Sequence, residues 1–224
     1  CSLGPLSFRA MSYLDSFQEL WHDLGASAWY GPWLETMEVL RMRVAKFLGT
    51  APEQLALLPS TSAALSVIAE SIDYSKRNRV VCTELDFPTL AYQWAVKPDV
   101  ELVILPSHDG VKVDLEQFAA AVDDRTAFLA TSHVFYTTGH IQDLDCLGEI
   151  AHQSGALLFV DGYQGPGQIP VDLGASKADF YTTGPLKWLC GGPGLSYLYV
   201  QEKLVKKLQP RIASWFGAED QFNF

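Results

Sequence analysis

A lone lysine stands among glycines, prolines and apolar residues, and its chemistry is the first question that the sequence raises. Lys187 lies in YTTGPLKWLCGGPG (residues 181–194), and no acidic residue occurs within five positions on either side. Most lysines in such loops lay their stem over apolar surface and keep the ammonium in water. A lysine held out of water instead has a lowered pKa and attacks carbonyl carbons. Lys187 is therefore a candidate for Schiff-base chemistry with an aldehyde cofactor.

An aspartate at the end of an apolar segment is a suitable partner for this lysine. Asp161 closes the run LLFVD, so a strand there would place its carboxylate at the carboxyl edge of a sheet. The alternative is a turn-forming aspartate that accepts hydrogen bonds from nearby N–H groups. Paired with Lys187, it fits pyridoxal phosphate, because an anion facing the pyridine nitrogen keeps the ring protonated and able to accept electrons.

Small hydroxyl residues mark a candidate phosphate site in LLPSTSAALS (residues 57–66). Thr61 and Ser62 open a helical pattern, and the N–H groups at a helix N-terminus attract anions. Helix capping by Ser60 or Thr61 explains the same residues equally well. The glycine patterns of P-loop and dinucleotide-binding proteins are absent from the sequence, so those readings lose support.

Two further segments place aromatic residues after apolar runs. Phe87, in ELDFPT, precedes a helical pattern and could either stack on a cofactor ring or belong to the core. The segment TSHVFYTTG brings His133 and Tyr136 to another strand end. We expect a structural role for His133 and hydrogen-bond donation to a phenolic oxygen for Tyr136.

These residues need a framework that brings strand ends together. After two helical patterns in the first fifty residues, short apolar runs alternate with amphipathic stretches, which indicates a mainly parallel sheet covered on both faces. Ligands of such sheets bind at the carboxyl ends of the strands. The runs at 178–184 and 195–200 are joined too closely for a helical crossover, so one strand should be antiparallel. We expect helices at 6–25, 34–49, 61–72, 87–97, 114–123, 143–155 and 201–208, and strands at 79–85, 100–106, 126–134, 156–163, 178–184 and 195–200.

The composition narrows the possible partners and compartments. The 224 residues carry a formal net charge of −10, which disfavours a nucleic-acid surface, and we expect no membrane partner. The four cysteines are widely spaced and form no cluster with metal-ligand spacing, so we expect free thiols and no metal site. The cytoplasm is the expected location.

Read together, the segments resemble the class V aminotransferase family of pyridoxal-phosphate enzymes of fold type I, most of all kynureninase-like and cysteine desulfurase-like members. The resembling segments are CSLG (1–4), PSTSAAL, ELDFPT, SHVFYTTGHIQDL, AHQSGALLFVDGYQGPGQIPVDL, ADFYTTGPLKWLCGGPGLSYLYV and SWFG (214–217). The resemblance implies a three-layer α/β/α large domain with a mostly parallel sheet and one antiparallel strand, an amino acid as the small-molecule substrate, and a homodimer.

The resemblance also assigns roles to particular residues. Lys187 would hold pyridoxal 5′-phosphate as a Schiff base and Asp161 would face the ring nitrogen. The other implied contacts are the phosphate at Thr61 and Ser62, the ring face at Phe87, the phenolic oxygen near Tyr136 and Gln164, and an aromatic contact to phosphate at Trp215. Freed from the cofactor, Lys187 would move the proton at the substrate's α-carbon.

The sequence departs from both specialised patterns of the family. Leu186 stands where kynureninase has a tyrosine before its lysine, and Gln164 is the desulfurase-like choice where kynureninase has a histidine. Desulfurases have Ser-x-His before the lysine, whereas this sequence has Gly184-Pro185-Leu186. We therefore expect a generic class V enzyme first, a kynureninase-like hydrolase or desulfurase-like lyase second, and a non-catalytic domain or inactive fragment third. We expect an N-terminal helical segment (1–50), a cofactor-binding domain (51–208) and the start of a truncated C-terminal region (209–224).

Overall fold

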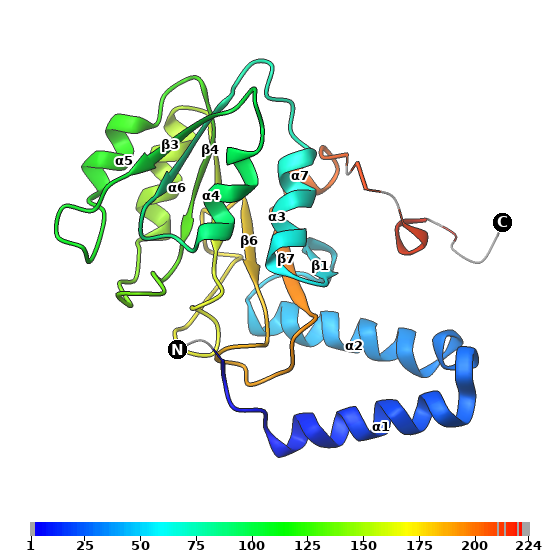
Figure 1. The fold of residues 1–224 in the computed structure, drawn as a ribbon. Helices are drawn as coiled ribbons and strands as arrows, with labels where there is room; N and C mark the ends of the chain where they lie inside the picture. The colour runs from blue at the N-terminus through cyan, green and yellow to red at the C-terminus, as the bar shows by residue number, and fades with distance from the viewer. Residues whose placement is uncertain (1–2, 210, 213, 219, 221–224) are drawn as a thin grey trace.

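A seven-stranded sheet forms the centre of the molecule in the computed structural model, which describes residues 3–209, 211–212, 214–218 and 220 (Figure 1). The strand order across the sheet is β1-β7-β6-β5-β4-β2-β3. The strands are β1 (Leu55–Leu58), β2 (Arg79–Thr83), β3 (Glu101–Leu105), β4 (Thr126–Ser132), β5 (Leu157–Asp161), β6 (Phe180–Thr183) and β7 (Ser196–Val200).

Strand direction follows the expectation. Strands β2 to β6 are parallel to one another, whereas β7 is antiparallel to both β6 and β1. The expected antiparallel strand is therefore confirmed, and it is the later member of the closely joined pair. Strand β7 pairs with β6 and β1 along its two edges, and its side chains belong to the core clusters on both faces of the sheet.

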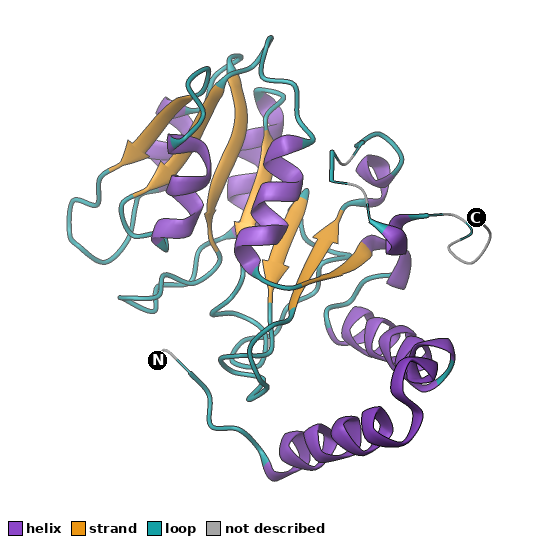
Figure 2. Cartoon of the chain, turned by 45° about the vertical axis from the view of Figure 1, so that its right-hand side comes forward, coloured by secondary structure: helices purple, strands orange, loops and turns teal. Residues whose placement is uncertain are grey.

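Helices cover both faces of the sheet, as Figure 2 shows from a second direction. One face packs against α2 (Pro32–Phe47), α5 (Leu115–Ala121) and α6 (Leu144–Gln153). The other face packs against α3 (Thr61–Glu70), α4 (Pro88–Ala95) and α7 (Glu202–Val205). Alternate residues of one strand face the two layers, as with Val80 and Val81 of β2, which belong to different core clusters. The three-layer α/β/α class is confirmed.

The first helix lies away from the sheet. Helix α1 (Phe8–Leu24) begins at the N-cap Ser7 and has no buried residue in the described chain. A 3₁₀ segment (Gly25–Tyr30) turns the chain into α2, and Phe17 of α1 stacks on Trp33 of α2 with ring centroids 5.0 Å apart. Large apolar side chains of α1, among them Phe8 and Trp21, remain exposed.

Two expectations about secondary structure were wrong. The segment Leu55–Leu58 forms strand β1, whereas we expected no strand before residue 79. The helix expected at 201–208 is a single turn, α7, which buries only Leu204 against the sheet. The proposed boundary near residue 50 falls between α2 and β1, and much of the expected C-terminal region, including residues 210, 213, 219 and 221–224, lies outside the described residues. No helix among the described residues is long and apolar enough to cross a membrane.

Candidate active site

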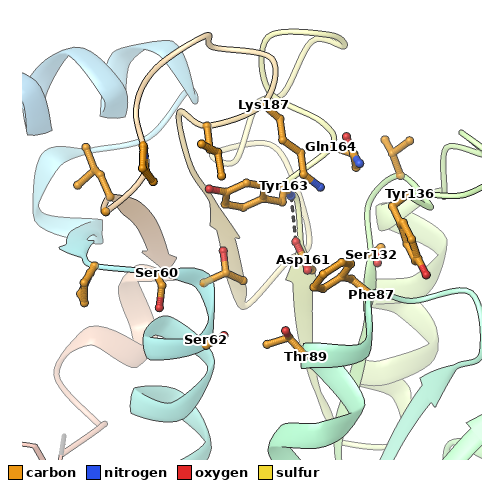
Figure 3. Close-up of a pocket in the computed structure, with 17 residues that line it drawn as sticks. Ser60, Ser62, Phe87, Thr89, Ser132, Tyr136, Asp161, Tyr163, Gln164 and Lys187 are labelled. Carbon is orange, nitrogen blue, oxygen red and sulfur yellow. Dashed lines mark hydrogen bonds between the residues drawn. The ribbon is translucent and has the colours of Figure 1, made fainter. Parts of the chain in front are cut away.

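A pocket of about 650 Å³ lies at the carboxyl ends of the parallel strands (Figure 3). Its walls come from the N-termini of α3 and α4, the ends of β4 and β5, and the loop between β6 and β7. Most of the lining is apolar, with a few hydroxyl, carboxyl and amine groups among it. The residues that line it are Pro59, Ser60, Thr61, Ser62, Phe87, Thr89, Ser132, Val134, Tyr136, Asp161, Tyr163, Gln164, Leu186, Lys187, Pro193, Gly194 and Leu195.

Lys187 reaches into this pocket from the loop that follows β6. Its Nζ lies 5.1 Å from the ring centroid of Tyr163 and 5.8 Å from that of Phe87. Within the described residues, Nζ makes no hydrogen bond or ion pair. Burial lowers the pKa of the Lys187 ammonium, and the charge of Asp161 opposes this only in part. The loop therefore presents an amine that gives up its proton more readily than an ordinary lysine.

Asp161 ends β5 and is buried beneath the lysine. Its Oδ1 accepts a hydrogen bond from the Tyr163 backbone N–H at 3.0 Å, dashed in Figure 3. The other carboxylate oxygen has no hydrogen-bond partner within the part of the chain that the structure describes. Burial raises the pKa of Asp161 to about 6, while the Tyr163 N–H and the Lys187 charge lower it in part. A second positive charge against this carboxylate would lower the pKa further.

The N-terminus of α3 forms another wall of the pocket. Ser60 is the N-cap, and its Oγ accepts a hydrogen bond from the Ala63 N–H at 3.1 Å. Thr61 and Ser62 are the first two helical residues, and N–H groups at these positions have no acceptor within their own helix. Capping and anion binding are therefore compatible here, because Ser60 caps while Thr61 and Ser62 line the pocket.

Aromatic side chains flank the lysine. Phe87, the N-cap residue of α4, is 45 % exposed, so it is not a core residue. Its ring lies edge-on to Tyr136, with centroids 5.3 Å apart. Tyr163 lies against the start of the loop after β6, where a Cβ on Gly184 would come within 2.8 Å of the Tyr163 ring. The pocket thus has flat apolar surfaces suited to a planar ring.

The loop after β5 packs closely against the loop that carries Lys187. Trp188 donates a hydrogen bond from its indole N–H to Oε1 of Gln164 at 2.8 Å. Gly167, in the left-handed region with φ 92°, allows the backbone of Trp188 to approach so closely that a Cβ there would lie 3.1 Å from it. The relative position of Asp161 and Lys187 is set by this packing.

Buried polar groups support the strand ends from behind. His133 is buried outside the pocket lining, and its Nδ1 lies 3.0 Å from the Tyr181 hydroxyl. Burial lowers the pKa of His133 to about 4, so the imidazole is neutral near pH 7. Asp86 accepts hydrogen bonds from the backbone N–H groups of Thr83 and Ser132 and from two threonine hydroxyls, and so ties β2 to β4.

The structure gathers most of the residues that the sequence singled out. Seven of them line one pocket: Thr61, Ser62, Phe87, Tyr136, Asp161, Gln164 and Lys187. Trp215 lies in a 3₁₀ turn (Trp215–Gly217) and is not among the lining residues, so its contact to phosphate stays a prediction. Sequence reasoning missed Tyr163, Thr89 and Ser132; only the position of Tyr163, two residues after Asp161, could have pointed to it.

Comparison with known proteins shows the family to which the chain belongs. The family model described as aminotransferase class-V matches residues 12–215, so the chain belongs to the class V aminotransferases. It is 37% identical to an uncharacterized aminotransferase, YcbU, of Bacillus subtilis, over 85% of this chain and 51% of that protein. It is 29% identical to the kynureninase of Geobacillus thermodenitrificans, over 100% of this chain and 55% of that enzyme. The chain thus spans about half the length of these relatives.

Solved structures agree on the fold. An apo cysteine desulfurase from Thermococcus onnurineus superposes with a TM-score of 0.71 at 26% identity, covering 79% of this chain and 45% of that one. The cystine C–S lyase C-DES superposes with a TM-score of 0.85 at 16% identity, covering 94% of this chain and 58% of the lyase. A mutant of that lyase carries glycine covalently linked to its pyridoxal-phosphate cofactor.

Family membership identifies pyridoxal 5′-phosphate as the cofactor, and the pocket fits it on independent grounds. The cofactor has an aldehyde, a basic ring nitrogen and a phosphate. The pocket offers an amine at Lys187 and a buried carboxylate oxygen at Asp161, both without a hydrogen-bond partner among the described residues, and helix N-terminal N–H groups at Thr61 and Ser62. Each of these three groups of the cofactor therefore has a chemically matched group within one cavity.

Proposed function

We propose that this protein is a pyridoxal-phosphate enzyme of the class V aminotransferase type that acts on an amino acid through Lys187. The observation that carries the proposal is that one pocket holds both the Lys187 amine and the buried Asp161 carboxylate. Among the described residues the amine makes no hydrogen bond, and only one of the two carboxylate oxygens accepts one. When bound, the cofactor supplies an aldehyde for the amine and a ring that accepts the electron pair freed at the substrate's α-carbon.

The residues of the chain would divide the remaining work. Asp161 would hold a proton on the ring nitrogen, since a buried anion favours a cation beside it. The N-terminus of α3, with Thr61 and Ser62, would bind the phosphate. Phe87 would cover the ring face, and Lys187, once released by substrate, would carry a proton to or from the α-carbon.

The direct test is chemical labelling. The protein is mixed with pyridoxal 5′-phosphate, reduced with borohydride, and mapped by mass spectrometry. We expect a visible absorption band and a reduced adduct on Lys187 that is lost in Lys187→Ala. Lys76→Ala, which removes an exposed lysine, is the matched control and should label like the unmodified protein. Labels spread over surface lysines, with no preference for Lys187, would contradict the proposal.

The type of reaction is a second question. Relatives include aminotransferase, kynureninase and cysteine desulfurase sequences, so hydrolase and lyase activities are the alternatives. Incubation with an amino acid and a 2-oxo acid should transfer the amino group if the aminotransferase reading holds. Release of alanine from kynurenine, or of sulfur from cysteine, would support the alternatives. An unreactive protein that still forms the Lys187 adduct would support a non-catalytic domain.

We also propose a homodimer in the cytoplasm. The surface of α1 supports the dimer, because Phe8 is 91 % and Trp21 60 % exposed there. Apolar side chains gathered on one helix favour burial in an interface. Sedimentation equilibrium tests the dimer: a monomer at micromolar concentration, unchanged by Trp21→Glu, would contradict it.

A further inference from the structure

The orientation of one side-chain amide at the pocket is fixed from outside the pocket. Gln164 is buried, lines the cavity, and accepts a hydrogen bond at Oε1 from the indole N–H of Trp188, at 2.8 Å. An amide can present either its oxygen or its NH₂ group to a neighbour, but an indole can only donate. The partner of Trp188 must therefore be the amide oxygen, and this contact decides which way the amide lies.

The consequence concerns the other half of the amide. With Oε1 held by Trp188, the donor group Nε2 is left for a partner elsewhere, and it makes no hydrogen bond within the described part of the chain. Gln164 lines the cavity, whereas Trp188 does not. At Gln164 the pocket is therefore lined by an N–H donor and not by a carbonyl oxygen.

We propose that Trp188 is a positioning residue that sets the Gln164 amide to donate to an oxygen of the bound cofactor or substrate. This inference rests on the proposed function. Trp188 itself touches neither, and acts only through Gln164.

The loop geometry makes this arrangement stable. Trp188 directly follows Lys187, so the residue that orients the Gln164 amide lies in the same loop as the amine. The left-handed Gly167 gives the Trp188 backbone room to approach the loop that holds Gln164. Because Trp188 is 36 % exposed, water competes for the indole N–H, and we expect an effect of moderate size.

The test separates orientation from packing. Trp188→Phe keeps an aromatic ring and removes the donor. We measure the Kd of pyridoxal 5′-phosphate by absorbance titration, and the midpoint pH of the bound cofactor's visible band. We expect Kd to rise about three- to tenfold, the range for one net hydrogen bond. The midpoint pH should rise, because an anionic oxygen that loses a donor binds a proton more readily.

A double-mutant cycle then shows whether Trp188 acts through Gln164. In a Gln164→Leu background, or Gln164→Met if the leucine variant unfolds, Trp188→Phe should change neither Kd nor the midpoint pH further. Tyr92→Phe, which removes the polar group of an exposed aromatic side chain outside the pocket lining, is the control and should leave both values unchanged.

The outcomes are distinct. Unchanged Kd and midpoint pH in Trp188→Phe overturn the inference, and so does an equal effect of that substitution with and without the Gln164 amide. Failure of the unmodified protein to bind the cofactor overturns the proposed function itself, and the inference with it.

Discussion

Replacing Asp161 by asparagine should stabilise the cofactor-free protein while it weakens cofactor binding. Burial raises the pKa of Asp161 from its ordinary value of 3.8 to about 6. A pKa difference of about two, at about 1.4 kcal/mol for each pH unit, gives about 3 kcal/mol of native-state destabilisation once the carboxyl is ionised. Asparagine keeps an oxygen for the Tyr163 N–H and carries no charge, so it removes this cost.

The sign of the effect depends on pH in a defined way. Between pH 4 and 6 the native state binds more protons at Asp161 than the unfolded state does, so this group lowers stability as pH rises. Above pH 6 the full cost is present, and below pH 4 it is absent. The stability advantage of Asp161→Asn should therefore be about 3 kcal/mol at pH 8 and approach zero near pH 4.

Urea unfolding of the cofactor-free protein and the variant at pH 8, 6 and 4 measures this difference. Asp86→Asn is the matched control of opposite sign. Asp86 is also buried, but its two oxygens accept four hydrogen bonds. In Asp86→Asn the NH₂ group would face hydrogen-bond donors, so we expect the unfolding free energy to fall by about 2 kcal/mol or more. Equal or lower stability of Asp161→Asn at pH 8, or a difference that does not change with pH, would refute the reasoning.

Two glycine substitutions test the close approaches around the site. In Gly4→Ala, the new Cβ would lie 1.9 Å from the Lys187 carbonyl oxygen, so the N-terminal segment should detach. We expect faster proteolysis near residue 4 and a change of less than about 0.5 kcal/mol in the unfolding free energy. Unchanged cleavage would contradict this prediction. In Gly162→Ala, the Cβ would lie 1.9 Å from the buried Tyr181 ring, and we expect a loss of about 2–4 kcal/mol in urea unfolding. Gly192→Ala, with no atom within 4 Å of its Cβ, is the control and should be near neutral.

Strand ends and helix starts could be predicted because the local sequence encodes them. The run LLFVD ends β5 at Asp161, and the serine and threonine residues at 60–62 begin α3. Both signals come from a few adjacent residues, and the rule for parallel sheets then brings the ends together. The position of Lys187 near Asp161 follows from the same rule.

Contacts between distant segments could not be predicted in this way. Strand β1 has four residues and no alternation, and it exists because it pairs with β7. The bond between Trp188 and Gln164 joins residues 24 positions apart, and nothing in either local sequence indicates it. Tyr163 was missed because its direction depends on how the loop after β5 turns.

The place of β7 in the sheet has a consequence for the order of folding. Strand β1 pairs only with β7 among the described strands, so its partner is made some 140 residues later along the chain. Pairing at such a separation is slow, because the entropy of a long loop must be lost first. We expect the parallel strands β2 to β6 to gain protection from pulsed hydrogen exchange before β1, and simultaneous protection would contradict this. Since α3 follows β1 and packs on β7, the end of the pocket that α3 forms would be the last part to assemble during synthesis.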